Sequence, residues 1–437
     1  MREWESSLRR CVLLLVLVGL IPTRLFADAS LNGRSITRIT FERTGGRTTE
    51  HVIRDELAVA EGQSFDPEAY LQGLQSLRNL QIFRSVEGSA APDGEHGVAL
   101  TVRLEEKWTT LPDLRFGGGG GITFYRLGIY DVNWLGRRIE GLASYENFNG
   151  THNGEIWLKH PDAFGRGWMG GATFKRQTVF QNRYDSARGL SQSVNFVRTV
   201  NAVEWGHQVS HHLRMGGDLS RESDHFTNRF LNFEQKAANF RNPPEQPEGG
   251  TTTYLGPTLL FNNVNVYGVQ YEGVRLDMRL GMASKEVTGD FSNTRFSANA
   301  RLYLATPWES NLCGYLFVAN STSLEPQHAI QLGGLFEIRG YYDGEIRGRK
   351  AWYYNFEYRI PSLRWDKFLL QHVVFNDGGQ ADDSWDKAFR GRSLMSYGTG
   401  IRIVPTFIHL LALRLDYAVR VEAPGSGGVS FGFLQFF

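Results

Sequence analysis

The sequence is poor in cysteine. Only Cys11 and Cys313 occur among its 437 residues, and Cys11 lies in an N-terminal segment that we expect to be cleaved off. The single thiol that would remain can form neither an internal disulfide nor a thiolate metal cluster. Cys11 also stands at the start of an apolar stretch rather than after it, which argues against a lipid-anchored cysteine.

An excess of either charge is also missing. The chain has 47 Lys and Arg residues against 46 Asp and Glu residues. Cleavage after Ala27 would remove four basic and two acidic residues and leave 43 against 44, a net charge of −1. A chain so balanced has no global attraction to nucleic acid, so we expect no nucleic-acid partner.

Long hydrophobic runs are confined to the N-terminus. Arginines precede the apolar stretch at 11–21, and small residues follow around Ala27, which is the pattern of a secretory signal. We therefore assign residues 1–27 to a signal peptide. No later apolar run approaches 18 residues, so a helical membrane protein is excluded. The abundant residues are 49 glycines and 13% aromatics, which favours many strands and turns.

Residues 33–107 are predicted to form a small α+β domain. Asp66 is an N-cap followed by proline at the first helical position, and Tyr70, Leu74 and Leu77 then recur at helical spacing. The expected elements are a strand at 36–41, a helix capped by Thr48 or Thr49, the helix after Asp66, a strand at 82–86 and a strand at 98–104. The order is β-α-α-β-β.

This small domain resembles a POTRA domain, the periplasmic module of the Omp85 superfamily. The resemblance rests on Gln63-Ser64-Phe65-Asp66 before the second helix and on Leu77-x-x-Leu80-x-Ile82-Phe83-x-x-Val86 after it. The family turn that usually reads Gly-Asn is here Gly45-Gly46, and glycine tolerates the same positive φ. The alternative is an unrelated α+β module.

Residues 111–437 are predicted to form a membrane β-barrel. Apolar and polar side chains alternate with period two over about 9–11 residues, the length of a membrane strand. In one such segment Val274, Leu276 and Met278 lie on one face, and Arg275 and Asp277 lie on the other. A soluble sandwich would alternate in the same way, but the polar faces hold both signs of charge densely. At about 20 residues per strand and connection, we expect about sixteen antiparallel strands.

Two motifs near the end of the chain resemble those of the Omp85 superfamily. Ile338-Arg339-Gly340-Tyr341 is similar to its V/I-R-G-Y/F motif, which lies at the tip of a loop folded into the lumen. Phe375-Asn376-Asp377-Gly378-Gly379 is similar to its F-x-D-x-G motif on the barrel wall. The resemblance implies that Arg339 pairs with Asp377. Guanidinium and carboxylate suit this role because they pair through two parallel hydrogen bonds. Gly340 would permit a tight turn, and Gly378 or Gly379 would let the loop approach the wall.

The last residues share an aromatic face. Phe431, Phe433 and Phe437 are spaced by two or four positions, and the segment resembles the C-terminal recognition strand of bacterial outer-membrane barrels. We therefore expect barrel assembly machinery to insert this chain. The alternative is an aromatic final strand in a soluble sheet.

A glycine run lies where the first barrel strand should begin. It comprises Gly117, Gly118, Gly119, Gly120 and Gly121. Glycine costs a strand about 0.5–1 kcal/mol per position relative to alanine. Because the first strand must close against the last, the run predicts a weak seam that opens laterally for a client strand. A flexible hinge after the small domain is an equal alternative.

Catalytic motifs are missing. The sequence has no Gly-x-Ser-x-Gly or His-Glu-x-x-His motif, and the glycine run lacks the following lysine of a phosphate loop. His207, His211 and His212 cluster on one expected strand, but polar lumen or loop histidines explain them better than a metal site. We expect no enzyme activity, no cofactor and no metal.

These expectations converge on an outer-membrane protein with its small domain in the periplasm. The resemblance implies that it inserts or translocates unfolded or extended polypeptide clients, which bind the POTRA-like domain. Its other partner would be outer-membrane lipid. The alternatives are a structural or pore-forming surface antigen without transport activity and, as a third class, an outer-membrane hydrolase.

Overall fold

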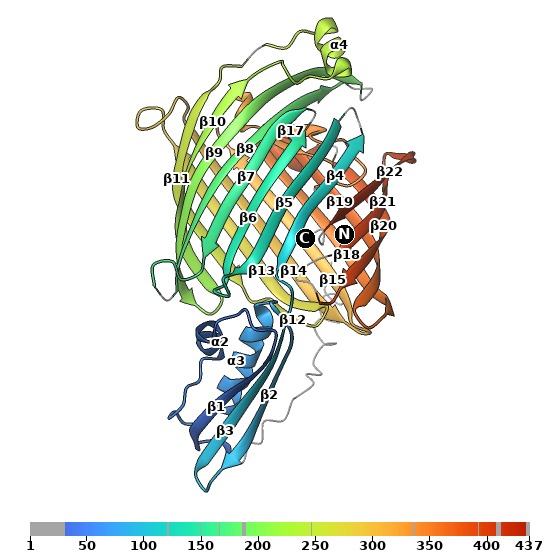
Figure 1. The fold of residues 1–437 in the computed structure, drawn as a ribbon. Coiled ribbons are helices and arrows are strands. Elements are labelled where there is room, and N and C mark those ends of the chain that lie inside the picture. Colours follow the sequence, from blue (N-terminus) through green and yellow to red (C-terminus); the bar gives the residue numbers. More distant parts are fainter. Residues whose placement is uncertain are drawn as a thin grey trace, which may run out of the picture.

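The structure is a computed structural model that describes residues 31–119, 122–148, 150–165, 167–185, 189–245, 247–334, 337–391, 393–407 and 412–433. The predicted signal peptide, Gly120, Gly121 and Phe437 lie outside these residues. Within the described ranges, no helix has the length and apolar character needed to cross a membrane. The chain forms a barrel with a small domain below it (Figure 1).

The small domain is a three-stranded sheet covered by two helices. Its elements are β1 (Ser35–Thr44), α2 (Glu50–Leu57), α3 (Pro67–Asn79), β2 (Phe83–Asp93) and β3 (Gly97–Glu106). The predicted β-α-α-β-β order is confirmed. The strand order is β1-β3-β2, with β1 parallel and β2 antiparallel to β3.

Local sequence signals account for the second helix. The Asp66 side chain accepts a hydrogen bond from the backbone N–H of Glu68 at 2.9 Å, and Pro67 opens the helix. The helix then buries Tyr70, Leu74 and Leu77 against the sheet. For α2 the cap position is Thr49, but its side chain makes no capping hydrogen bond.

Apart from two short strands that pair with each other, the remaining strands close into one barrel. Neighbouring strands pair antiparallel, and the described residues form sixteen long strands and the three-residue β12, as predicted. The strands are β4 (Thr110–Gly119), β5 (Ile122–Trp134), β6 (Ile139–Phe148), β7 (Thr151–His160), β8 (Trp168–Tyr184), β9 (Leu190–Ser210), β10 (Leu213–Phe226), β11 (Gly250–Asn262), β12 (Asn265–Tyr267), β13 (Gln270–Ala283), β14 (Asn293–Thr306), β15 (Ser310–Ser321), β18 (Lys350–Arg364), β19 (Phe368–Asp382), β20 (Leu394–Pro405), β21 (Leu413–Arg420) and β22 (Ala423–Phe433). The first barrel strand, β4, lies beside the last, β22.

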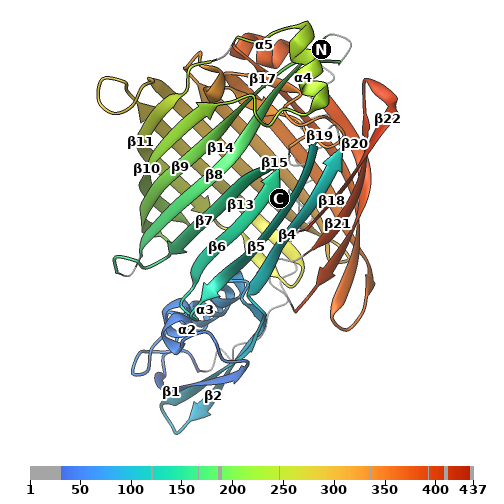
Figure 2. The ribbon, with the colours of Figure 1, turned by 45° about the horizontal axis from the view of Figure 1, so that its top comes forward.

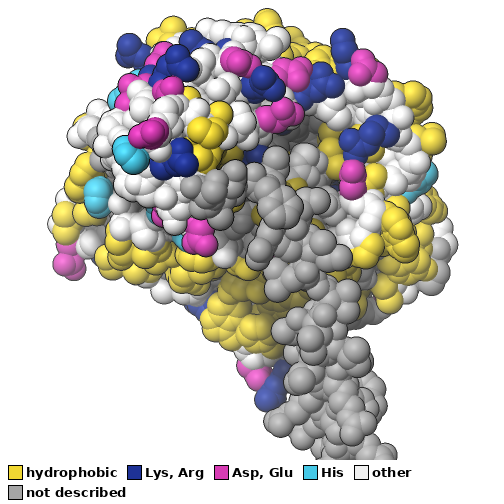
Figure 3. Space-filling view, turned by 90° about the horizontal axis from the view of Figure 1, so that it is seen from below, with side chains coloured by type: hydrophobic (Ala, Val, Ile, Leu, Met, Phe, Trp, Pro, Cys, Tyr) yellow, Lys and Arg dark blue, Asp and Glu magenta, His cyan; other side chains and the backbone are white. Residues whose placement is uncertain are grey.

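The two faces of the wall differ as the alternation predicted. Leu302 on β14 and Val274 on β13 are opposite each other and partly exposed on the outer face. In the view of Figure 3, hydrophobic side chains line much of the outline of the barrel. On the inner face Arg279 of β13 reaches Glu204 of β9 at 3.6 Å. The apolar face therefore suits lipid and the charged face a hydrated lumen.

We call the end of the barrel that carries the small domain the near rim, and the opposite end the far rim. Two helices at the far rim, α4 (Phe233–Arg241) and α5 (Trp385–Arg390), are absent from the sequence prediction (Figure 2). The prediction of one strand carrying three histidines is wrong, because β9 ends at Ser210. His211 and His212 form the turn to β10 at the near rim.

The small domain is fastened to the β5–β6 turn of the near rim. The side-chain amide of Asn133 donates to the hydroxyl of Thr48 at 2.8 Å, and the backbone N–H of Thr49 donates to the carbonyl of Gly136 at 2.9 Å. A Cβ at Gly136 would stand 1.8 Å from the carbonyl oxygen of Arg47, and its φ is +69°. Only glycine fits here.

Two further contacts extend this attachment around the rim. The Asn79 side chain at the end of α3 exchanges hydrogen bonds with Asn265 and with the backbone N–H of Val266 in β12, at 3.0 and 3.2 Å. The backbone N–H of Trp108 donates to the carbonyl of Phe407 at 3.2 Å, in the turn after β20. Val132 of β5 is buried in the core of the small domain. The domain thus spans separate parts of the near rim.

Candidate functional site in the barrel lumen

The connection between β15 and β18 folds back inside the barrel. It contains a 3-10 turn at Pro326–His328 and two short paired strands, β16 (Ile330–Leu332) and β17 (Ile346–Gly348). Ile338 and Tyr341 of this connection, which we call the lumen loop, are buried against Ala351 and Leu394 of the wall. The motif Ile338-Arg339-Gly340-Tyr341 is therefore the tip of an inward-folded loop.

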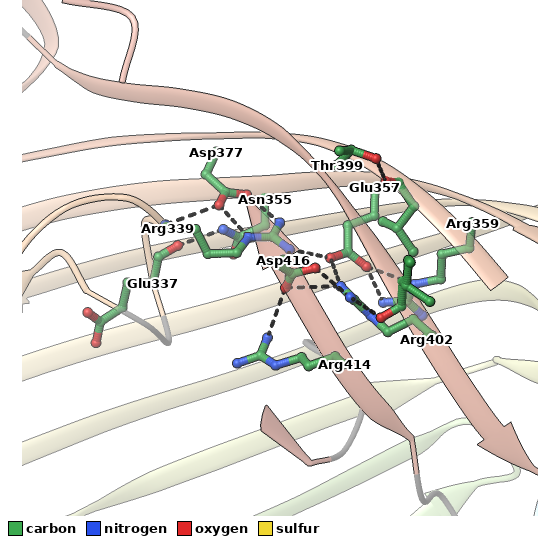
Figure 4. Close-up of polar contacts among 12 residues, drawn as sticks. Glu337, Arg339, Asn355, Glu357, Arg359, Asp377, Thr399, Arg402, Arg414 and Asp416 are labelled. Atoms are coloured by element: carbon green, nitrogen blue, oxygen red, sulfur yellow. Dashed lines mark hydrogen bonds and ion pairs between the residues drawn. The ribbon is translucent and has the colours of Figure 1, made fainter. Parts of the chain in front are cut away.

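The Arg339 side chain reaches Asp377 on β19, the pairing that the motif resemblance implied (Figure 4). Its Nε and Nη2 donate to the two carboxylate oxygens at 2.7 and 2.8 Å, and its backbone N–H donates to the same carboxylate at 3.2 Å. Both side chains are fully buried. This two-pronged geometry fixes the direction of the loop tip as well as its position.

Further charged groups surround this pair. Arg339 Nη1 donates to Glu357 on β18 at 2.8 Å and to Asp416 on β21 at 3.3 Å. Glu357 also accepts from Arg359 at 2.8 Å and from Arg402 on β20 at 3.3 Å, and Arg402 donates to Asp416. We call these residues, with Arg414, the Arg339 cluster: Arg339, Glu357, Asp377, Asp416, Arg359, Arg402 and Arg414.

The charges of the Arg339 cluster nearly balance. Four guanidiniums face three carboxylates, and in Figure 4 the side chains of four wall strands converge on the loop tip. Arginine stays protonated in proteins. Removing one partner of a buried ion pair leaves the other charge buried without a partner, at a cost of about 3–5 kcal/mol. The cluster thus behaves as one unit rather than as separate pairs.

Phe375 contributes an aromatic face to the cluster. The guanidinium carbon of Arg339 lies 3.5 Å from the centroid of the Phe375 ring, so the cation stacks on it. On the neighbouring strand, a Cβ at Gly398 would come within 2.4 Å of that ring. The glycine makes room for the ring. Phe375 and Asp377 of the wall motif therefore both contact Arg339.

The two residues after Arg339 are held separately. Gly340 has φ +89°, and its carbonyl accepts from Arg420 Nε at 2.6 Å. The Tyr341 hydroxyl donates to the carbonyl of Met395 at 2.7 Å. A Cβ at Gly428 of β22 would lie 3.3 Å from the Gly340 Cα. The absence of a side chain at Gly428 therefore lets the loop lie close to β22.

The wall glycines Gly378 and Gly379 lie close to tyrosines of β18. A Cβ at Gly379 would come within 2.5 Å of the Tyr353 Cβ, and one at Gly378 within 2.7 Å of the Tyr354 ring. These glycines therefore make room for the two tyrosines. That they also let the lumen loop approach the wall stays a prediction. Gly428, which no sequence motif marked, is a wall glycine that lies against the loop at Gly340.

The start of the lumen loop is attached to another part of the wall. Gln181 of β8 donates to the carbonyl of Pro326 at 2.6 Å, and Arg198 of β9 donates to the carbonyl of Gln327 at 2.8 Å. His328 shares hydrogen bonds with Thr252 of β11 at 3.0 Å and with Ser323 at 2.8 Å. The loop is therefore attached to the β8–β11 wall at its start and to the β18–β21 wall at its tip.

The other predicted site residues that the structure describes lie on β4 and β22. Gly117, Gly118 and Gly119 end β4, whose barrel neighbours are β5 and β22. In β22, Phe431 is half exposed and Phe433 is the last residue. The seam between β4 and β22 is thus built partly by the predicted glycines.

Sequence reasoning missed most of the cluster around the Arg339 pair. Glu357, Arg359 and Arg402 belong to neither motif, and nothing in the sequence joined them to Arg339. The signal present was a charged residue at an inward position of each strand. Over the residues that the structure describes, no group of three or more His, Cys, Asp or Glu side chains is arranged to hold a metal ion. The contacts of the cluster attach the lumen loop to the barrel wall.

Two family models match the chain. A model described as the Omp85 superfamily domain matches residues 133–437, and one described as POTRA, surface antigen variable number repeat, matches residues 35–107. No curated protein matches the chain significantly.

Solved structures share the fold at low sequence identity. BamA from Haemophilus ducreyi lacking POTRA domains 1–3 is 16% identical with a TM-score of 0.52, over 92% of this chain and 84% of that one. CdiB from Acinetobacter baumannii is 14% identical with a TM-score of 0.57, over 92% and 74%. CdiB from Escherichia coli is 12% identical with a TM-score of 0.56, over 95% and 92%. At these identities the likeness concerns the fold alone.

Proposed function

Because the chain belongs to the Omp85 superfamily, we propose that it inserts other polypeptides into the outer membrane or translocates them across it. In this proposal the near rim and the small domain face the periplasm. The observation that carries the proposal is the tip of the lumen loop, which is held by ionic hydrogen bonds of Arg339 to three wall strands. Such bonds can be exchanged for bonds to a client or to water, so an arriving chain can compete for them.

The small domain would receive the client. Its strand order leaves β1 and β2 as sheet edges. An extended polypeptide can add to such an edge through backbone hydrogen bonds, with little demand on its sequence. No cofactor is needed in this scheme, because folding of the client provides the free energy.

The seam between β4 and β22 would be the lateral exit. Glycine stabilises a strand poorly, and Gly117, Gly118 and Gly119 end β4 at this seam. Cysteines at Gly119 and, in turn, at Val429 or Phe431, in a chain with Cys313 replaced by alanine, test the exit. If a chain locked by disulfide keeps full activity, the seam does not open during the reaction.

Depletion of the protein followed by a census of outer-membrane and secreted proteins tests the function itself. We expect the level of at least one other barrel or secreted protein to fall and to recover when the wild-type chain is restored. The same census with an Arg339→Ala chain asks whether the lumen loop is needed.

The alternative function is a structural or pore-forming surface protein. The observation that favours it is the complete burial of Arg339, Glu357 and Asp377, since the same contacts would hold a permanent plug. In that case depletion leaves the levels of all other barrel and secreted proteins unchanged. The chain's own insertion would in either case use barrel assembly machinery that reads its C-terminal strand.

A further inference from the structure

A cavity of about 240 Å³ lies where the small domain meets the near rim. Its walls come from the segment after α3, from the linker after β3, and from the rim at β12–β13, β18–β19 and the end of β20. It shares no residue with the Arg339 cluster. In Figure 1 the small domain lies directly below β12 at this rim. We call this space the junction cavity.

Lys107 brings an uncompensated charge to the junction cavity. Its backbone N–H donates to the carbonyl of Ile82 at 2.8 Å, which fixes the residue beside the cavity. Within the described part of the chain, its ammonium has neither a hydrogen-bond partner nor a carboxylate within ion-pair distance. Burial lowers the pKa of Lys107 to about 8. The group is thus mostly charged at neutral pH and lacks an anion.

The other charged residues of the cavity wall do not supply that anion. Arg84 pairs with Glu105 at 3.0 Å, and Arg364 pairs with Glu309. Asp366 is the acidic residue of the wall, and it forms no ion pair with Lys107. Three cationic side chains and one carboxylate line the wall, and Lys107 is the cation among them that has no ion pair, so the wall favours an anionic ligand.

Gln371 adds an unused hydrogen-bond acceptor to the same cavity. Its side chain on β19 is 4% exposed, and its amide oxygen has no hydrogen-bond partner among the described residues. A buried acceptor left without a hydrogen bond destabilises the protein, because its lost hydration is not replaced. A ligand that offers an N–H group would remove this cost. The cavity therefore suits a ligand that carries both an anionic group and a hydrogen-bond donor.

Apolar side chains complete the wall. Val266 of β12 is 8% exposed, and Val404 of β20 and Trp365 of the β18–β19 turn line the space beside it. The volume is below the range of about 300–1,000 Å³ that encloses drug-sized ligands. The cavity therefore suits the end of a chain.

We propose that the junction cavity binds the C-terminal end of a polypeptide client. The terminal carboxylate pairs with Lys107, an amide N–H of the last residues donates to Gln371, and an apolar terminal side chain packs against Val266, Val404 and Trp365. Inorganic phosphate would satisfy Lys107 but neither Gln371 nor the apolar wall. The inference rests on the proposed function and names the part of the client that is held at the near rim.

Peptide binding to the full chain in detergent tests the proposal. The probe is a short N-acetylated peptide that ends in Val-Phe with a free carboxylate, and its partner is the same peptide with a C-terminal amide. We expect the amide to bind about tenfold or more weakly, the loss that one charge-assisted hydrogen bond represents. Lys107→Gln should lower the affinity for the acid peptide by a similar factor and leave the affinity for the amide peptide unchanged.

Two variants serve as controls. Lys367→Gln removes a neighbouring charge of the β18–β19 turn that does not line the cavity, and it should bind both peptides like the wild type. Lys107→Arg keeps the charge and should keep the preference for the acid peptide. Heat-dependent migration on gels checks that each barrel is folded.

Equal affinity of the two peptides for the wild-type chain would overturn the proposal, as would unchanged acid binding in Lys107→Gln. Competition by inorganic phosphate as strong as that by the acid peptide would also overturn it, since the cavity would then be a simple anion site. These results concern the peptide alone. The proposed function is tested separately, by depletion. If peptide binding fails but depletion still lowers the level of other barrel proteins, the proposed function stands and only the peptide site is ruled out.

Discussion

Arg339 and Asp377 are 38 positions apart in the sequence and meet through two parallel hydrogen bonds of 2.7 and 2.8 Å, with neither side chain exposed to solvent. One residue is the tip of the lumen loop, and the other belongs to β19. Because the fork of a guanidinium fits a carboxylate in one orientation, this contact fixes both the depth and the rotation of the tip.

Replacing Asp377 by asparagine should release the loop tip. The change leaves the volume of the side chain nearly intact but removes a buried negative charge, so four arginines would face two carboxylates. We expect a loss of about 3–5 kcal/mol in the stability of the docked tip. The measurement is protease cleavage of the lumen loop in the folded barrel, which should become fast in the variant.

Arg349→Lys is the matched control for this experiment. Arg349 lies close to the same loop and pairs with Asp383 at 3.4 Å, but both side chains are partly exposed. An exposed pair contributes about 0–1 kcal/mol, so this variant should resist protease like the wild type. Equal cleavage of the two variants would show that burial of the Arg339 pair is unimportant.

Gly340→Ala should also loosen the tip, through the backbone. Gly340 has φ +89°, where an L side chain is strained by about 1–2 kcal/mol. Its Cβ would also lie 3.2 Å from the Ala418 Cβ. We expect faster hydrogen exchange at Arg339 and Tyr341. Gly425→Ala, where a Cβ meets no atom within 4 Å, should leave exchange unchanged.

Gln181→Leu should free the start of the lumen loop while the tip stays docked. The Gln181 amide donates to the carbonyl of Pro326 at 2.6 Å, and leucine removes this bond. Hydrogen exchange is expected to rise over residues 322–332 and to stay slow at Arg339, because separate walls hold the two ends. A parallel rise at Arg339 would mean that the two attachments act as one.

Binding of the acid peptide should depend on pH through Lys107. Burial lowers the pKa of this ammonium to about 8, and only the protonated form attracts a carboxylate. The affinity should therefore be level near neutral pH and fall as the pH rises through about 8. The other charged groups that line the cavity are Arg84, Arg364 and Asp366. Lys107→Arg should bind with an affinity independent of pH, and a flat profile for the wild type would contradict the role of Lys107.

The barrel was predictable because its signal is local. Successive side chains of a strand face opposite sides, so the alternation that includes Val274 and Arg275 indicates a wall with one apolar and one polar face. Arg339 and Asp377 were found through short motifs. Glu357 and Arg402 were not, because their contact depends on the register of β18 to β21, which long-range pairing sets.

The attachment of the small domain was hidden for a related reason. Thr48 and Thr49 were the two alternatives predicted for the cap of the first helix, and Thr49 occupies the cap position. The Thr48 hydroxyl instead accepts from Asn133, which is 85 positions away. A polar residue before a helix serves either purpose, and only the distant partner decides between them.

Val132 of β5 is buried in the core of the small domain, and Tyr130 packs against that core. A fragment cut after Glu106 would therefore lack part of its own interior. The small domain therefore completes its packing only when the end of β5 is in place. A domain boundary drawn in the linker thus divides the small domain from the barrel in sequence, but the packed core of the small domain extends beyond it into β5.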